Sequence, residues 1–255
     1  MQNIFEKKLL KNIDRVTCYS AEQSGFKREV LLYRFTLFYS DPSDVIPECE
    51  NEIKKWAKLE HSTIIPIIDI TIEEKEIKFA TRKPEGNSVD SAKGDISTIQ
   101  TWSIARSLAS GLLALHQAGI FLGGIKETHL FYESEKWIRF SPDVLGERLN
   151  RQVEIKKLNI NVANREKEEA IKDISTWGCF IACLLMGDQS FVPLKKINLS
   201  NQKSQLDLEI AGRNPEVTKS QEEFLKSVIF SATSQDKKFT NFEQIIDTLN
   251  KEILS

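Results

Sequence analysis

Long apolar runs are missing from this 255-residue sequence, and their absence limits what the chain can be. No segment has eighteen consecutive apolar residues, and the opening MQNIFEKKLLKN has no apolar core of the kind that signal peptides carry. We therefore expect neither a membrane-spanning helix nor a secretion signal in this sequence. A reducing, cytoplasmic setting fits these features best.

Cysteine, histidine and net charge are also scarce. The four cysteines (Cys18, Cys49, Cys179 and Cys183) form no CxxC pair, and the three histidines lie far apart in the sequence. This spacing predicts buried thiols, with no disulfide framework and no zinc site. A net charge of −2 with 28% charged residues gives no reason to expect a nucleic-acid or membrane partner.

What is present begins with a strand-rich region. Runs rich in β-branched, aromatic and leucine residues cover 29–39, 63–72 and 76–82 and predict strands. Between the first two, residues 47–61 place apolar side chains near helical spacing and predict one amphipathic helix.

From residue 97 onward the pattern becomes helical. Residues 97–120 predict a long amphipathic helix closed by Gly119. Residues 172–188 are apolar nearly all round, which indicates a central buried helix, and two amphipathic segments follow, at 221–233 and 240–254. A strand-rich front and a helical back predict an α+β protein in two lobes.

Three segments, taken in order, resemble parts of the eukaryotic-type protein kinase fold. The segment 50–69 resembles the family's helix C and the strand after it, 111–131 resembles its catalytic-loop region, and 173–192 resembles its central helix F. The resemblance implies one kinase-like domain over 1–255. It would have a small β-rich N-lobe with one main helix (about 1–83), a hinge (about 82–87) and a larger helical C-lobe (about 88–255).

The nucleotide-holding parts that the resemblance implies are altered. The glycine-rich loop would fall near residues 16–29, which contain only Gly25, so a close backbone cradle for phosphate is not expected. In the segment that resembles the hinge, Thr81 stands at the inner end. Pro84 occupies the position whose backbone N–H would bind adenine, and proline has no N–H.

The resemblance places Arg34 where the family has its phosphate-gripping lysine, and Glu52 where it has the acid of helix C. One interpretation is a bidentate Arg34–Glu52 pair that holds the helix against the sheet without nucleotide. The alternative is a register one residue away, with Arg34 pointing to solvent.

The loop that resembles the catalytic loop, LGGIKETH (122–129), lacks the family's chemistry. Gly124 replaces the catalytic acid, so nothing there can accept a substrate proton. His129 replaces a magnesium-binding amide and is best interpreted as a hydrogen-bonded structural residue, because magnesium prefers oxygen ligands. Gly123 replaces an arginine, and Lys126 alone signifies little.

The metal-binding Asp-Phe-Gly motif of the family aligns with Pro142, Asp143 and Val144, and a one-residue slip would make Asp143 the metal acid. No Ala-Pro-Glu motif occurs between residues 145 and 172. Phe239 stands where the family has the arginine that pairs with that glutamate, so both partners of a buried ion pair are lost together.

Architectural positions are kept. Trp56, Ile67 and Leu122 match the apolar spine that joins the lobes, and Asp173 matches the acid that opens helix F and holds the catalytic-loop backbone. A kept core with altered polar positions resembles a pseudokinase. We therefore expect no catalysis, no cofactor or metal, and weak or no ATP binding. The expected role is that of a protein-interaction scaffold or allosteric regulator, whose partner is an active kinase or a larger complex.

Three alternatives stay open at this point. The first is an atypical kinase-fold enzyme that performs other chemistry on a nucleotide, with the polar residues Arg34, Glu52, Lys126, His129 and Asp143. The second is nucleotide binding without catalysis. The third is an unrelated α+β domain with accidental matches.

Overall fold

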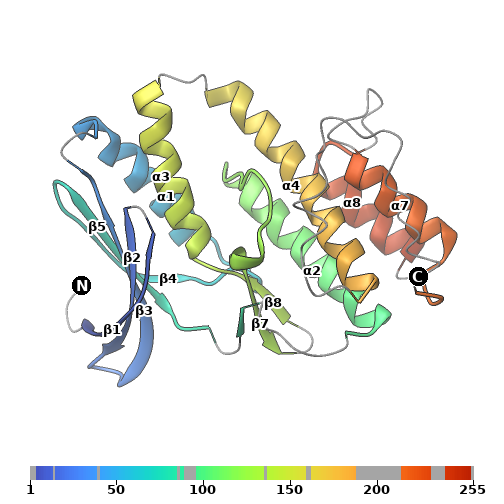
Figure 1. The fold of residues 1–255 in the computed structure, drawn as a ribbon, viewed down its shortest axis with the longest axis horizontal. Helices are drawn as coiled ribbons and strands as arrows, with labels where there is room; N and C mark the ends of the chain where they lie inside the picture. Colours follow the sequence, from blue (N-terminus) through green and yellow to red (C-terminus); the bar gives the residue numbers. More distant parts are fainter. Residues whose placement is uncertain are drawn as a thin grey trace.

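An antiparallel sheet of five strands forms the N-terminal part of the structure (Figure 1). The structure is a computed structural model that describes residues 4–13, 15–38, 41–84, 87–88, 96–134, 137–158, 162–187, 214–230 and 239–253. The strands are β1 (Ile4–Ile13), β2 (Val16–Gln23), β3 (Arg28–Thr36), β4 (Ile67–Ile72) and β5 (Glu76–Arg82), in the order β1-β2-β3-β5-β4.

The central strand β3 decides which side chains face inward. Leu31, Tyr33 and Phe35 lie directly opposite Thr81, Phe79 and Ile77 of β5, and all six are buried. Because strand side chains alternate between faces, Arg34 belongs to the outer face. The helix α1 (Ile46–Ala57), entered through a 3-10 turn at Ser43–Val45, buries Cys49, Glu52, Ile53 and Trp56.

Among the described residues no further strand pairs with either edge of this sheet, and β1 is irregular. Its pairing with β2 shifts between Glu6 and Lys8 and again between Leu9 and Lys11, which marks two bulges. Phe5, Leu9 and Leu10 of this strand are half or more exposed.

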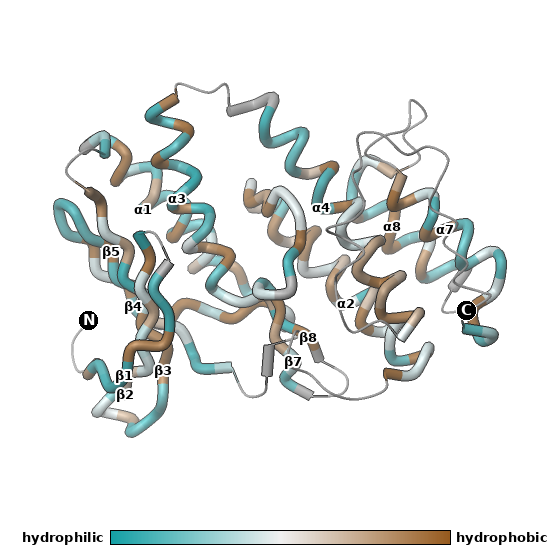
Figure 2. Tube along the Cα trace, viewed as in Figure 1, coloured by the Kyte–Doolittle hydropathy of each residue, from teal (hydrophilic) through white to brown (hydrophobic). Residues whose placement is uncertain are grey.

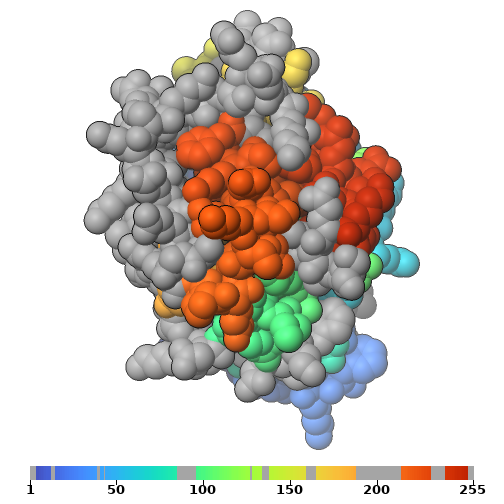
Figure 3. Space-filling model, turned by 90° about the vertical axis from the view of Figure 1, so that its right-hand side faces the viewer, coloured from blue at the N-terminus to red at the C-terminus, as the bar shows by residue number. Residues whose placement is uncertain are grey.

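Helices make up most of the remaining described residues. They are α2 (Thr98–Gln117), α3 (Asp143–Leu158), α4 (Val162–Leu185), α7 (Lys219–Ile229) and α8 (Phe242–Thr248), which continues into a π-helical turn at Leu249–Ile253. A small sheet of β6 (Asn87–Ser88), β7 (Leu130–Ser134) and β8 (Trp137–Phe140) joins them, with a 3-10 turn at Glu127–His129. Figure 3 shows α7, in orange, across one end of the molecule with α8, in red, beside it.

Local sequence explains where α2 begins and ends. Ser97 and Gln100 form a capping box at its start, and Gly119 ends it with a positive φ of 72°. Gly111 lets the helix approach the chain closely, because a Cβ there would lie 2.2 Å from Thr63 Oγ1. Thr63 in turn accepts a hydrogen bond from Phe140 N at 2.7 Å, which ties the N-terminal part to β8.

The helix α4 changes character along its length. Figure 2 shows its N-terminal half as hydrophilic and its C-terminal half as hydrophobic. Trp177, Phe180 and Ile181 of the hydrophobic half are fully buried, and α4 packs against both α2 and α7.

The structure confirms a strand-rich N-terminal part with one main helix and a helical C-terminal part. The predicted strands at 29–39, 63–72 and 76–82 correspond to β3, β4 and β5, and the thiols of the four cysteines are free and buried. Among the described residues, no helix is both long enough and apolar enough to cross a membrane. The last residues of the predicted final helices lie outside the described ranges.

Two positions need correction. Residues 16–29 are β2, the turn after it and the start of β3, whereas the connection between β1 and β2 lies earlier, around residues 14–15. Gly25 therefore belongs to the second turn of the sheet. Asp173 does not open a helix, because α4 begins eleven residues earlier, at Val162.

Candidate functional site

The loop between α2 and β7 holds the positions that resemble a catalytic loop. Asp173 of α4, fully buried, accepts hydrogen bonds from the backbone N–H groups of Leu122 (2.8 Å) and Gly124 (2.7 Å). Its Oδ2 also lies 2.9 Å from His116 Nε2. The predicted role of Asp173 in holding this loop is confirmed by these contacts.

Both glycines of the loop have backbone conformations that disfavour a side chain. The φ angles are +72° at Gly123 and +114° at Gly124. A Cβ at Gly123 would lie 3.0 Å from Arg151 Nη1, and one at Gly124 would lie 3.4 Å from Thr176. At Gly123 a Cβ would force its neighbours to shift slightly, whereas at Gly124 the contact would be ordinary, so the positive φ is the main obstacle to an acid at position 124.

His129 is buried and structurally committed. Its Nδ1 accepts a hydrogen bond from the backbone N–H of Lys126 at 3.2 Å, so the remaining proton sits on Nε2. That nitrogen faces Glu147 Oε1 at 3.3 Å, and Lys126 Nζ lies 2.5 Å from the other Glu147 oxygen. Burial alone would raise the pKa of Glu147, but hydrogen bonding to His129 and then to Lys126 lowers it to about 2.

The segment after β8 turns at once into helix α3. Pro142 precedes it and Asp143 is its first residue, with its backbone N–H bonded to Ser141 Oγ at 3.1 Å. The Asp143 carboxylate pairs with Lys11 Nζ at 2.5 Å and hydrogen-bonds with the hydroxyl of Tyr33. Both contacts commit this carboxylate to groups of the sheet.

Helix α3 fills the space between the N-terminal sheet and the loop 120–129. Val144, Leu145, Leu149 and Val153 are buried to 1% exposure or less. A Cβ at Gly146 would lie 3.1 Å from both methyl groups of Val16 on β2, so the helix contacts the sheet directly. Figure 1 shows α3 alongside α1 in this central position.

The inner face of the sheet presents Tyr33 and not Arg34. Tyr33 is fully buried and stacks on Phe79, with ring centroids 4.9 Å apart. Burial, and then the charge of Asp143, raise the pKa of the Tyr33 hydroxyl well above its usual value, so it stays neutral. The described inner face of β3 therefore offers no cation to a phosphate group at this point.

The predicted Arg34–Glu52 pair is wrong. Arg34 pairs with Glu6 and, at 3.3 Å, with Glu76 on the outer face. The register is one residue from the predicted one, as the alternative interpretation had it.

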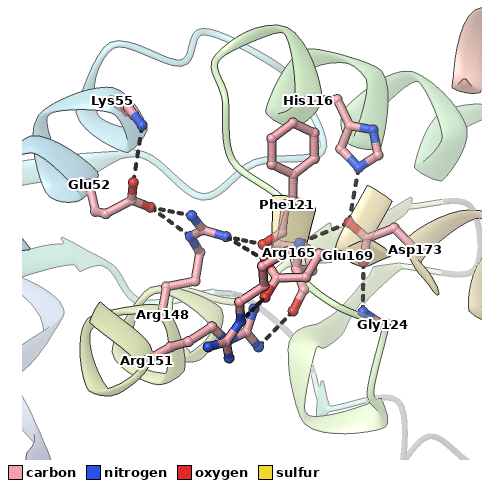
Figure 4. Close-up of polar contacts among 11 residues, drawn as sticks. Glu52, Lys55, His116, Phe121, Gly124, Arg148, Arg151, Arg165, Glu169 and Asp173 are labelled. Carbon is pink, nitrogen blue, oxygen red and sulfur yellow. Dashed lines mark hydrogen bonds and ion pairs between the residues drawn. The ribbon is translucent and has the colours of Figure 1, made fainter. Parts of the chain in front are cut away.

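Glu52 instead belongs to a buried ionic cluster (Figure 4). Its Oε2 accepts hydrogen bonds from Arg148 Nε and Nη2, both at 2.6 Å, and its Oε1 lies 3.1 Å from Lys55 Nζ. Arg148 also donates to the carbonyl of Phe121 and lies 3.9 Å from Glu169. This arginine contacts α1, the loop 120–129 and α4 at once.

Arg151 extends the cluster by one turn of α3. It donates to the carbonyl of Leu122 at 3.0 Å and pairs with Glu169 at 3.0 Å, and Glu169 also pairs with Arg165 at 2.9 Å. The absence of a side chain at Gly123 leaves room for the Arg151 guanidinium.

The five predicted polar residues do not form one site. Lys126 and His129 face Glu147 of α3, and Asp143 is the first residue of that helix. Glu52 belongs to the ionic cluster, and Arg34 lies on the outer face of the sheet. Within the described ranges, no group of three or more His, Cys, Asp or Glu side chains could hold a metal ion. Asp143, the first residue of α3, and Glu147, just over one turn later, are each paired with a lysine.

Sequence reasoning missed three residues of the ionic cluster, Arg148, Arg151 and Glu169, and two residues outside it, Tyr33 and Glu147. The apolar residues at 144, 145, 149 and 153 follow helical spacing and were the available signal for α3. No sequence pattern indicated that the charged residues between them would be buried. The spine residues are better predicted, since Trp56 and Leu122 are in the main core and Ile67 packs against it.

Comparison with known proteins adds the fold and no closer relationship. No family model and no curated protein matches the sequence. Among solved structures, the apo form of PpkA-294, a bacterial Ser/Thr kinase domain, matches with a TM-score of 0.68 and 10% sequence identity. The match covers 98% of this chain and 96% of that one. The fold is kinase-like.

Proposed function

We propose that this chain is a kinase-like module without phosphotransfer activity that acts by binding another protein. A kinase reaction requires a held triphosphate with its metal ions and an acid that orients the acceptor hydroxyl. The loop 122–129 offers glycine in place of that acid. The carboxylate in contact with Gly124, that of Asp173, holds the loop backbone, and Asp143 and Glu147 are paired with lysines.

The observation that supports the proposal is that helix α3 lies between the sheet and the loop 120–129, the region in which the kinase resemblance would put a nucleotide. Four fully buried apolar side chains of α3 contribute about 6–12 kcal/mol together, at about 1.5–3 kcal/mol each. The whole folding stability of a domain is about 5–15 kcal/mol. Displacing α3 to admit a ligand would therefore consume most of the stability of the fold.

The proposed partner is a protein, either an active kinase or a larger complex. We infer a macromolecular partner for two reasons: Pro84 lacks the N–H that the kinase resemblance would use to bind adenine, and α3 lies between the sheet and the loop 120–129.

Two measurements test the catalytic half. Incubation with labelled ATP and either Mg²⁺ or Mn²⁺, with generic protein substrates, should give no phosphotransfer above background. A thermal-shift titration with the same nucleotide should leave Tm unchanged. A ligand at a hundred times its Kd would stabilise by about 2.7 kcal/mol, or about 5–11 °C for a chain of this size.

The control is Asp143→Ala, which removes the carboxylate that a one-residue slip would assign to metal. Turnover that is present in the unchanged chain and lost in this variant would overturn the proposal and favour the atypical enzyme. A nucleotide-dependent rise in Tm without turnover would favour non-catalytic nucleotide binding.

The partner half is tested with a defined kinase. Proximity cross-linking in cells followed by mass spectrometry identifies kinases in contact with the chain. Purified chain is then added to each candidate, and its rate is measured. A change in the rate of the candidate kinase at stoichiometric amounts supports the proposal, and unchanged rates for every cross-linked kinase contradict it.

A further inference from the structure

We propose that α3 is a permanent brace between the N-terminal part and the helical part, so that the chain itself, and no ligand, fixes their relative position. The central contact is Arg148, whose guanidinium binds Glu52 on α1 and the carbonyl of Phe121 in the loop 120–129. One side chain thus joins a helix of the N-terminal part to the loop of the helical part.

Contacts to the N-terminal part continue along the whole of α3. Asp143 pairs with Lys11 of β1 at its start, and Gly146 lies against Val16 of β2 one turn later. Near the end of the helix, Lys156 pairs with Asp44 (3.0 Å) and Lys157 with Asp41 (2.7 Å).

Contacts to the helical part lie on the neighbouring face of the helix. Arg151 binds the carbonyl of Leu122 and pairs with Glu169 of α4, and Glu147 pairs with Lys126. The carboxylates of Glu52 and Glu169 and the Arg148 guanidinium are at most 9% exposed. Buried charges are tolerated only in a geometry that keeps them paired, so the cluster accepts one relative placement of the three helices.

The consequence concerns partner recognition. A lid that opens has fewer buried contacts than the core and exchanges its backbone amide hydrogens faster. The backbone amide hydrogens of a brace exchange at about the same rate as those of the core. Any surface that spans both parts of this chain then exists before a partner arrives, and binding requires no prior closure.

Native-state hydrogen exchange on the unmodified full chain, without nucleotide, tests this directly. The amides of residues 147–153 in α3 should exchange within about tenfold of those of 104–112 in the core of α2. Exchange in α3 that is faster by about a hundredfold or more would identify a lid and overturn the proposal. The measurement involves no phosphotransfer. The brace can therefore be refuted while the proposed function stands, and the proposed function can be refuted while the brace stands.

A distance measurement provides the second test. Spin labels at Phe26→Cys and Ile99→Cys report on the two parts, because both side chains are more than 70% exposed and the four native thiols are buried. A pair within the helical part, Ile99→Cys with Glu223→Cys, gives the reference width. If α3 is a brace, the distance distribution between the two parts should be as narrow as that of the reference pair. Adding Mg·ATP should change neither distribution.

Variants of α3 separate the brace from general charge effects. Arg148→Met should broaden the distance distribution between the two parts, whereas Lys156→Ala, which removes an exposed ion pair from the same helix, should not. Equal widths for the two variants would overturn the role of Arg148. If circular dichroism shows that Arg148→Met does not fold, the proposal is decided by the unmodified sequence, through its hydrogen-exchange rates and the width of its distance distribution between the two parts.

Discussion

Glu52 and Arg148 form the buried pair whose removal tests the energetics of the fold most directly. The perturbation is a double-mutant cycle of Glu52→Leu, Arg148→Met and the combination of both. Each single change leaves one buried charge without its main partner, which typically costs about 3–5 kcal/mol. Both survivors keep a weaker partner, because Lys55 lies 3.1 Å from Glu52 and Glu169 lies 3.9 Å from Arg148.

We therefore expect about 3 kcal/mol for each single change, at the lower end of that range. The double variant removes both charges and replaces them with apolar groups, so it should also cost about 3 kcal/mol instead of about 6 kcal/mol. The coupling energy of the cycle is then about 3 kcal/mol. For a chain of this size each single change lowers Tm by about 6–12 °C.

The assay is urea unfolding at neutral pH, followed by far-UV circular dichroism and tryptophan fluorescence. Lys156→Ala is the matched control, since its partly exposed pairs with Asp44 and Glu48 should contribute less than about 1 kcal/mol. Additive costs in the double variant would refute the reasoning. So would a cost for each single change that does not exceed that of the control.

Three further predictions concern the helix–loop contacts. In Glu147→Gln, the free energy of unfolding should change less as pH falls below about 4.5, because the folded pKa of Glu147, about 2, lies below the ordinary 4.5. The carboxylate therefore stabilises above about pH 4.5, by about 1 kcal/mol after allowance for exposure, and loses this as pH falls toward 2; an unchanged pH dependence in urea titrations contradicts it. In Gly111→Ala the new Cβ would lie 2.2 Å from Thr63 Oγ1, and this overpacking should lower the free energy of unfolding by about 1–3 kcal/mol. The gain in helix propensity, about 1 kcal/mol, should not offset this cost. A higher Tm would contradict the prediction and show that Thr63 moves freely. Gly124→Asp should restore no phosphotransfer and should cost about 1–2 kcal/mol, because its φ is +114°; turnover in the labelled-ATP assay would contradict this.

Apolar periodicity explains why most of the fold could be predicted from the sequence. Ile53 and Trp56 point to one face of α1, and Leu108, Leu112 and Leu115 to one face of α2, and all are buried. Hydrophobic side chains reveal the face they bury, whatever their partner is. The prediction for Asp173 had another basis, the resemblance of residues 173–192 to helix F of the kinase family, and its contacts to the loop bear that prediction out.

The candidate site was less predictable because its contacts are polar and distant in sequence. Arg148 and Glu52 are 96 residues apart, and charged side chains are usually exposed, so nothing in the sequence marks them as buried partners. Residues 31–33 of β3 are all apolar, which hides the alternation that would have placed Tyr33 inside and Arg34 outside. Helix α3 was missed because its buried face is split by Arg148 and Gly146.

The two bulges of β1 bear on how the protein behaves when it is concentrated. An edge strand with Phe5, Leu9 and Leu10 half or more exposed is a template for stacking of identical chains. The bulges interrupt its hydrogen-bonding repeat, and Lys8 adds an exposed positive charge, so a second copy would meet this edge with mismatched spacing. Acylation of the Lys8 amine would leave the interrupted hydrogen-bonding repeat as the main obstacle to stacking at this edge.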